Sequence, residues 1–151
     1  MLLEGNHLLI HWRVLILYKP TIMPNAPYRL YLVDDDRFLL DMYAVKFKAA
    51  GHEVTAFSAG EEVLKALREQ PAPDALLVDI VMPAMTGFEI LEAIKQENLA
   101  ETTKLIVLSN QGQESDIEQA KALGADGYII KASAIPSEVF SETIRIIETG
   151  A

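Results

Sequence analysis

The sequence has no cysteine among its 151 residues, and this absence removes several kinds of chemistry at once. Disulfides, thiolate metal sites and cysteine nucleophiles are excluded, and nothing points to an oxidising compartment, so we expect a cytoplasmic protein. Positive charge is also scarce, because 13 lysines and arginines face 22 aspartates and glutamates, for a formal net charge of −9. Neutralising phosphates needs clustered lysine and arginine, so direct binding to nucleic acid is not expected.

The sequence also lacks an uninterrupted hydrophobic run long enough to cross a membrane. Residues 8–18, "LLIHWRVLILY", are apolar but are broken by His11 and Arg13, and a membrane span needs about 20 apolar residues. A secretory signal is a poor match, since no positive region precedes the run and no small-residue cleavage site follows it. We interpret residues 1–27 as an extension outside the domain, with Met23 as an alternative start. A short amphipathic helix on a membrane or a partner stays open.

What the sequence does have is enough apolar material for one core. Half of the residues are apolar and 23% are charged, which is typical of a globular chain and not of a disordered one. At this length the chain forms one well-packed domain and is too short for two ordinary ones. We therefore expect a single domain over residues 28–151.

From Arg29 onward, short apolar runs alternate with stretches of helical period, five times each. The expected strands cover residues 29–34, 52–58, 74–79, 103–110 and 126–131, and the expected helices cover residues 37–51, 59–70, 86–98, 114–124 and 136–150. The first helix places Phe38, Met42, Val45 and Ala49 on one face and stops at Gly51. Right-handed crossovers turn such a chain into an α/β fold with a doubly wound, five-stranded parallel sheet.

Polar side chains gather where the expected strands end. Those ends carry Asp34, Asp35, Asp36, Asp79, Ser109 and Lys131. Ligands of doubly wound sheets bind outside the carboxyl ends of the strands. Asp34 and Asp35 beside Asp79 would repel one another unless a cation or Lys131 neutralises them. Mg²⁺ fits this cluster best, because it prefers hard oxygen ligands and bridges carboxylates to phosphoryl groups.

Four stretches, "LVDDD", "LLVDIVMPAMTG", "LSN" and "GADGYIIK", resemble the receiver domain of two-component response regulators. The resemblance spans residues 29–149 in the same order and spacing, and it implies a flavodoxin-like, CheY-like sheet with strand order 2-1-3-4-5. It also implies that Asp79 accepts phosphate from a histidine kinase. Mg²⁺ would then be held by Asp34, Asp35, Asp79 and the backbone carbonyl of Val81.

The same resemblance assigns three further residues. Lys131 would assist phosphate transfer, Ser109 would be the switch hydroxyl, and Tyr128 the aromatic switch residue. A carboxylate can attack phosphorus only if the charges are screened, which Mg²⁺ and Lys131 would do. Such a module is not a classical enzyme, since its chemistry is limited to its own phosphorylation and dephosphorylation. For Tyr128, a partly buried aromatic at a strand end is an open alternative. We expect Asp36 to cap the following helix.

The expected partners follow from the absence of histidine at this edge of the sheet. All three histidines lie elsewhere, so the phosphohistidine donor must be another protein, either a histidine kinase or a phosphotransfer protein. The last expected helix ends close to Ala151, so we expect output through a downstream partner protein, with the chain a monomer or a weak phosphorylation-dependent dimer. Two positions depart from the family pattern: Ala132 stands where proline is usual, and Asn110 where alanine or glycine is usual.

Two other functions stay open on the sequence. Asp34 and Asp36 formally match the nucleophile and acid of haloacid-dehalogenase-like phosphatases. Arg37 occupies a position where that motif usually has threonine or valine, and no cap domain is evident. The other possibility is a binding scaffold that uses the same fold without phosphate.

Overall fold

A computed structural model describes residues 27–150 of the chain, so the predicted extension lies outside the described residues except for Pro27. The elements follow one another as β1 (Arg29–Val33), α2 (Arg37–Ala49), β2 (Glu53–Phe57), α3 (Gly60–Glu69), β3 (Ala75–Val78), α4 (Gly87–Gln96), β4 (Lys104–Ser109), α5 (Glu114–Ala122), β5 (Gly127–Ile130), the 3-10 turn η2 (Lys131–Ser133) and α6 (Pro136–Thr149). The strands form one parallel sheet in the order β2-β1-β3-β4-β5, which confirms the predicted fold class and strand order.

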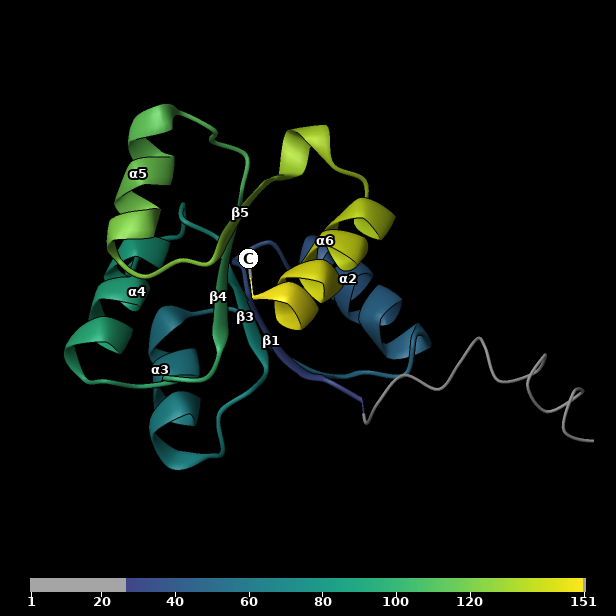
Figure 1. The fold of residues 1–151 in the computed structure, drawn as a ribbon, viewed down its shortest axis with the longest axis horizontal. Coiled ribbons are helices and arrows are strands. Elements are labelled where there is room, and N and C mark those ends of the chain that lie inside the picture. Colours follow the sequence, from purple (N-terminus) through teal and green to yellow (C-terminus); the bar gives the residue numbers. More distant parts are fainter. Residues whose placement is uncertain (1–26, 151) are drawn as a thin grey trace, which may run out of the picture.

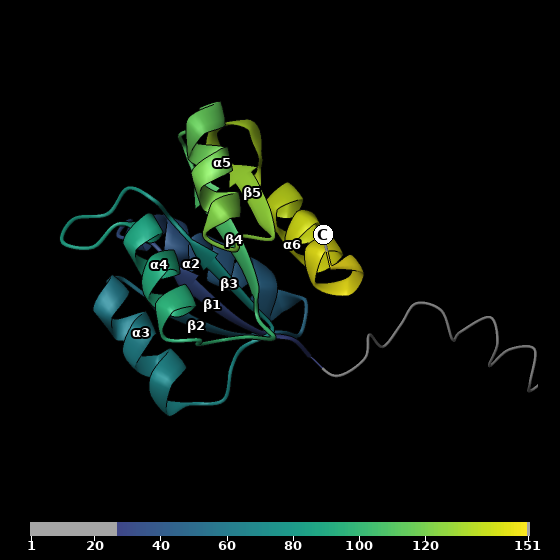
Figure 2. The ribbon, with the colours of Figure 1, turned by 60° about the vertical axis from the view of Figure 1, so that its left-hand side comes forward.

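Helices cover both faces of the sheet (Figure 1). Helices α3, α4 and α5 lie on one face, and α2 and α6 lie on the other, as the turned view in Figure 2 also shows. In β1 the side chains alternate between the two layers: Tyr31 and Val33 join the first core, while Leu30 and Leu32 join the second. This alternation is the period of two expected for a strand buried on both faces, and it explains why the central strands read as unbroken apolar runs.

Helix α2 buries the opposite face from the apolar face recognised in the sequence. Its buried residues are Leu40, Tyr43, Ala44 and Phe47. Of the expected set, Phe38 is 76% exposed and Val45 is 67% exposed. The apolar face recognised in the sequence is therefore not the face that packs on the sheet. The helix is apolar on two opposite sides, and period alone does not say which of them meets the sheet.

Glycines are required at two helix ends and at one close backbone contact. Gly51 and Gly124 adopt φ angles of 93° and 94°, where they end α2 and α5 as the sequence predicted. Gly87 begins α4 against the end of β3, and a Cβ atom there would lie 2.3 Å from the backbone oxygen of Asp79. Only glycine allows this close approach, which holds the start of α4 against the residue that follows β3.

None of the helices within residues 27–150 combines the length and the apolar character needed to cross a membrane.

Candidate functional site

The register of the sheet brings two aspartates side by side. Val33 of β1 pairs with Val78 of β3, so Asp34 and Asp79 leave the sheet at the same level. Both residues are buried, at 3% and 7% exposure, whereas Asp35 next to them is exposed. The three side chains offer carboxylate oxygens that all lie within 4.8 Å of one another. The predicted acidic cluster therefore exists as a compact group at the carboxyl end of the sheet.

Lys131 reaches this group from the turn that follows β5. Its Nζ lies 2.5 Å from Asp34 Oδ2 and 3.5 Å from Asp79 Oδ2, and its side chain is buried. The described residues contain no cis peptide bond, so Ala132 continues the chain in the trans form. Lys131 thus lies between the two carboxylates with alanine at position 132, where the resemblance leads us to expect proline.

The charges of the site do not balance. Burial raises the pKa of Asp79 above its ordinary value, Lys131 opposes this shift, and the charge of Asp34 adds to it. Burial by itself would lower the pKa of Lys131, but its hydrogen bond to Asp34 and the nearby charges of Asp34 and Asp79 raise that pKa overall. One ammonium faces two buried carboxylates and an exposed third, so the site keeps surplus negative charge. That surplus suits a divalent cation.

An open cavity of about 400 Å³ lies over these groups. It is lined by Asp34, Asp35, Asp36, Leu39, Asp79, Val81, Ser109, Asn110, Gln111 and Lys131. Val81 donates its N–H to Asp79 Oδ1 at 3.3 Å. Asp36 caps α2, since its carboxylate accepts the N–H groups of Phe38 and Leu39, as predicted. The cavity is open to solvent and carries the three carboxylates of Asp34, Asp35 and Asp79, which fits a hydrated Mg²⁺ ion.

The two residues predicted as switches are joined through Gln111. The N–H of Gln111 donates to Ser109 Oγ at 3.2 Å, and the hydroxyl of Tyr128 donates to the backbone oxygen of Gln111. Ser109 is fully buried, and Tyr128 is half-buried. Burial raises the pKa of Tyr128, and the Ser109 hydroxyl beside it lowers that pKa in part. A group that moves Ser109 would therefore act on Tyr128 through one peptide.

Sequence reasoning missed two neighbours of the site on α2. Leu39 lines the cavity, and Tyr43 is buried close enough to Lys131 and Asp34 for both charges to act on its pKa, which burial raises. Helical spacing from the cap residue Asp36 places Leu39 and Tyr43 one and two turns further along the helix. This spacing points to the two residues only when the packed face of α2 is known.

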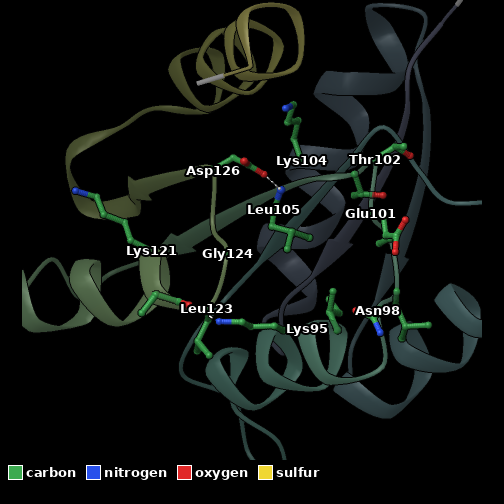
Figure 3. Close-up of a pocket in the computed structure, with 15 residues that line it drawn as sticks. Lys95, Asn98, Glu101, Thr102, Lys104, Leu105, Lys121, Leu123, Gly124 and Asp126 are labelled. Atoms are coloured by element: carbon green, nitrogen blue, oxygen red, sulfur yellow. Dashed lines mark hydrogen bonds between the residues drawn. The ribbon is translucent and has the colours of Figure 1, made fainter.

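A second cavity, of about 430 Å³, lies at the opposite end of the sheet between the ends of α4 and α5 (Figure 3). Two of its charged side chains bind backbone groups. Lys95 Nζ donates to the backbone oxygen of Ala122 at 2.9 Å, and Asp126 Oδ2 accepts the N–H of Leu105 at 2.8 Å. These groups hold helix and strand ends in place, so size alone does not make this cavity a reaction site.

Residues 30–139 match the family described as the response regulator receiver domain. The chain is 35% identical over 111 residues to the chemotaxis protein CheY of Treponema pallidum, covering 72% of this chain and 76% of that protein. It is 33% identical over 118 residues to the response regulator SaeR of Staphylococcus epidermidis, covering 78% of this chain and 49% of that protein.

Solved structures agree with this similarity. The structure of the chemotaxis protein CheY4 of Vibrio cholerae superposes with a TM-score of 0.71 at 27% identity, covering 80% of this chain and 99% of that one. The chain spans about half the length of several relatives that it matches, among them SaeR and the transcriptional regulatory protein AfsQ1 of Streptomyces coelicolor.

Proposed function

The chain belongs to the response regulator receiver family, and from this premise we propose that Asp79 accepts a phosphoryl group from a phosphohistidine on another protein. The observation that carries the proposal is the buried trio of Asp34, Asp79 and Lys131 at the carboxyl end of the sheet. Two carboxylates and an ammonium held together away from water are costly for folding alone, and such perturbed groups gather at functional sites. Receiver domains are signalling modules and not classical enzymes, and this chain is one of them.

Transfer to Asp79 would proceed by attack of a carboxylate oxygen on phosphorus. The new bond joins Asp79 to the phosphoryl group, the bond from phosphorus to the donor imidazole breaks, and the imidazole keeps the electron pair and takes up a proton. Asp79 Oδ2 faces Lys131, and Asp79 Oδ1 accepts the N–H of Val81. Both oxygens are thus oriented before phosphate arrives, and Lys131 lies where it can pair with a phosphoryl oxygen.

The three carboxylates fit Mg²⁺ by their oxygen chemistry and surplus charge. Asp34, Asp35, Asp79 and the backbone carbonyl of Val81 would hold the ion. It would supply the positive charge that screens the attacking carboxylate from the incoming phosphate. Since Asp34 also binds Lys131, loading the site would require Lys131 to share Asp34 or to turn further toward Asp79.

The response would pass through Ser109 and Tyr128. A phosphoryl oxygen on Asp79 would attract the Ser109 hydroxyl, and the Gln111 peptide links Ser109 to Tyr128. Tyr128 lies on β5, between α5 and α6, so the altered surface would be the one these elements form. A downstream protein would read that surface. The chain would act in the cytoplasm, as a monomer or as a weak dimer when phosphorylated.

The phosphatase alternative loses support from the position of Asp36. That alternative needs Asp36 as an acid facing the substrate, but its carboxylate caps α2 through two backbone N–H groups. The scaffold alternative predicts no covalent phosphate at all.

Acetyl phosphate tests the proposal directly. In Mg²⁺ buffer, the intact mass of the chain should rise by one phosphoryl group, and Asp79→Asn should abolish the gain, because an amide oxygen is a far weaker nucleophile. Asp36→Asn is the matched control, since it removes the same charge from a helix cap, and asparagine caps equally well. Equal labelling of Asp79→Asn would disprove the assignment, and no labelling of the unmodified chain would favour the scaffold.

A further inference from the structure

Helix α2 presents a second apolar face that the rest of residues 27–150 leaves largely exposed. The outer stripe consists of Phe38, Met42, Val45 and Ala49, and it lies on the side of the helix opposite to the packed residues. Phe38 and Val45 are 76% and 67% exposed, Ala49 is exposed as well, and Met42 is half-buried. Single exposed apolar residues are ordinary, but an aligned set on one helix face marks a contact surface.

The chain itself carries an apolar segment that can reach the outer stripe. Residues 8–18, "LLIHWRVLILY", hold nine apolar residues, and residues 19–27 connect them to the domain. The domain begins beside the carboxyl end of α2: the N–H of Tyr28 donates to His52 Nδ1 at 3.1 Å, and the N–H of His52 donates to the backbone oxygen of Phe47 at 3.1 Å. The point of attachment is therefore next to one end of the outer stripe.

The lengths agree with a contact inside one chain. A connection of nine extended residues covers up to about 30 Å, whereas a helix of 13 residues is about 20 Å long. A tethered segment also has a high effective concentration at a surface so close to its attachment.

We propose that residues 8–18 pack on the outer stripe of α2 of the same chain. This contact removes from water the apolar surface of both partners, including the part of the stripe that the domain leaves exposed. Asp36 lines the cavity over Asp79, and Phe38 lies two residues further along the chain, so the segment covers α2 beside that cavity. A protein that docks along α2 must displace it. The packing itself does not depend on phosphate.

Trp12 offers a direct test, because it is the only tryptophan of the chain and lies in the segment. In the full chain, acrylamide should quench Trp12 several-fold less than it quenches a free peptide of residues 8–18. Phe38→Glu and Val45→Glu place a charge on the outer stripe and should restore quenching to the peptide value. Both sites are exposed, so the fold should persist, which circular dichroism verifies. Ile135→Glu, at a residue 60% exposed elsewhere, should change nothing.

Three outcomes would overturn the proposal. Trp12 quenched as readily in the full chain as in the peptide would mean that the outer stripe is left for another protein. Shielding that survives both α2 variants would place the segment elsewhere. Shielding that disappears on dilution would mean that the stripe is covered by a second copy of the chain.

Discussion

The two ends of the parallel sheet hold cavities of nearly equal volume, about 400 Å³ at the carboxyl end and about 430 Å³ at the amino end, yet their charged groups are used differently. At the carboxyl end, Asp34, Asp79 and Lys131 are buried together, and negative charge exceeds positive. At the amino end, Lys95 and Asp126 are exposed, and each satisfies a backbone group.

This difference separates a reaction site from a structural crevice. A charged side chain that completes a helix or strand end already has a partner within the fold. Buried carboxylates in excess of their cation are incomplete until another cation or a charged ligand arrives. Buried charge that is not balanced, and not the size of the cavity, identifies the site.

The largest effect should come from removing the positive charge of Lys131. Lys131→Met leaves Asp34 and Asp79 buried without their partner, so we expect the free energy of unfolding to fall by about 3–5 kcal/mol in the absence of divalent metal. Added Mg²⁺ should recover part of the loss, because it binds the same carboxylates. Urea unfolding with EDTA and with Mg²⁺ measures both effects.

Lys95→Met provides the control at the amino end. It removes one hydrogen bond to a backbone oxygen from an exposed lysine, so a loss of about 1 kcal/mol or less is expected, with no recovery by Mg²⁺. Equal losses in the two variants would contradict the contrast between the two ends.

The next effect concerns the lifetime of the phosphorylated form. Val81 is 54% exposed at the cavity, and its side chain cannot hydrogen-bond an attacking water, so we expect self-dephosphorylation with a half-life of many minutes or longer. Val81→Asn offers an amide that can orient this water and should accelerate decay by up to about 10²-fold. Loss of the label from purified phosphoprotein measures the rate.

Val81→Ala is the control for side-chain size at this position, because it opens the cavity without adding a polar group. Its decay should stay close to that of the unmodified chain. Acceleration by alanine as large as that by asparagine would show that access, and not orientation of the water, limits hydrolysis.

Metal affinity should depend on one exposed acid and not on its neighbour. Asp35→Asn removes a carboxylate whose oxygen lies within 4.8 Å of those of Asp34 and Asp79, and should weaken Mg²⁺ binding about tenfold or more. Asp36→Asn changes the same charge one residue further along but should have little effect, since Asp36 caps α2. Isothermal titration calorimetry compares the Mg²⁺ affinities of the two variants. An equal loss of affinity in both would mean that only the net charge near the site matters.

The smallest effect lies at the amino end, where His52 is buried between Tyr28 and Phe140. Burial lowers the pKa of His52, so the unfolded chain binds this proton more readily than the folded one. His52 therefore stabilises the fold above the ordinary histidine range, and this contribution is lost as the pH falls through its lowered folded-state pKa.

His52→Asn keeps an acceptor for the N–H of Tyr28 but does not titrate in this range. The free energy of unfolding of this variant should fall less between neutral and mildly acidic pH than that of the unmodified chain. Parallel slopes for both proteins would show that the His52 proton is not linked to folding.

The sequence alone determined the five strand and helix pairs, the ends of α2 and α5 at Gly51 and Gly124, and the cluster of acids with Lys131 at one edge of the sheet. It could do so because strand ends are marked by a change from apolar to polar residues, and because parallel strands all end at the same edge. The role of Asp36 as a helix cap could also be predicted, because Asp36 directly precedes a stretch with helical periodicity.

Only the tertiary structure decided which side of α2 is buried and which carboxylate Lys131 contacts most closely. Phe38, Met42 and Val45 are as apolar as Leu40, Tyr43 and Phe47, and both sets recur with the helical period. The choice between them depends on which side chains fit against the sheet and α6, and this is a property of shape that no periodicity encodes. Lys131 is 97 residues from Asp34 along the chain, so their contact at 2.5 Å exists only because β3 and β4 place β5 and β1 in one sheet.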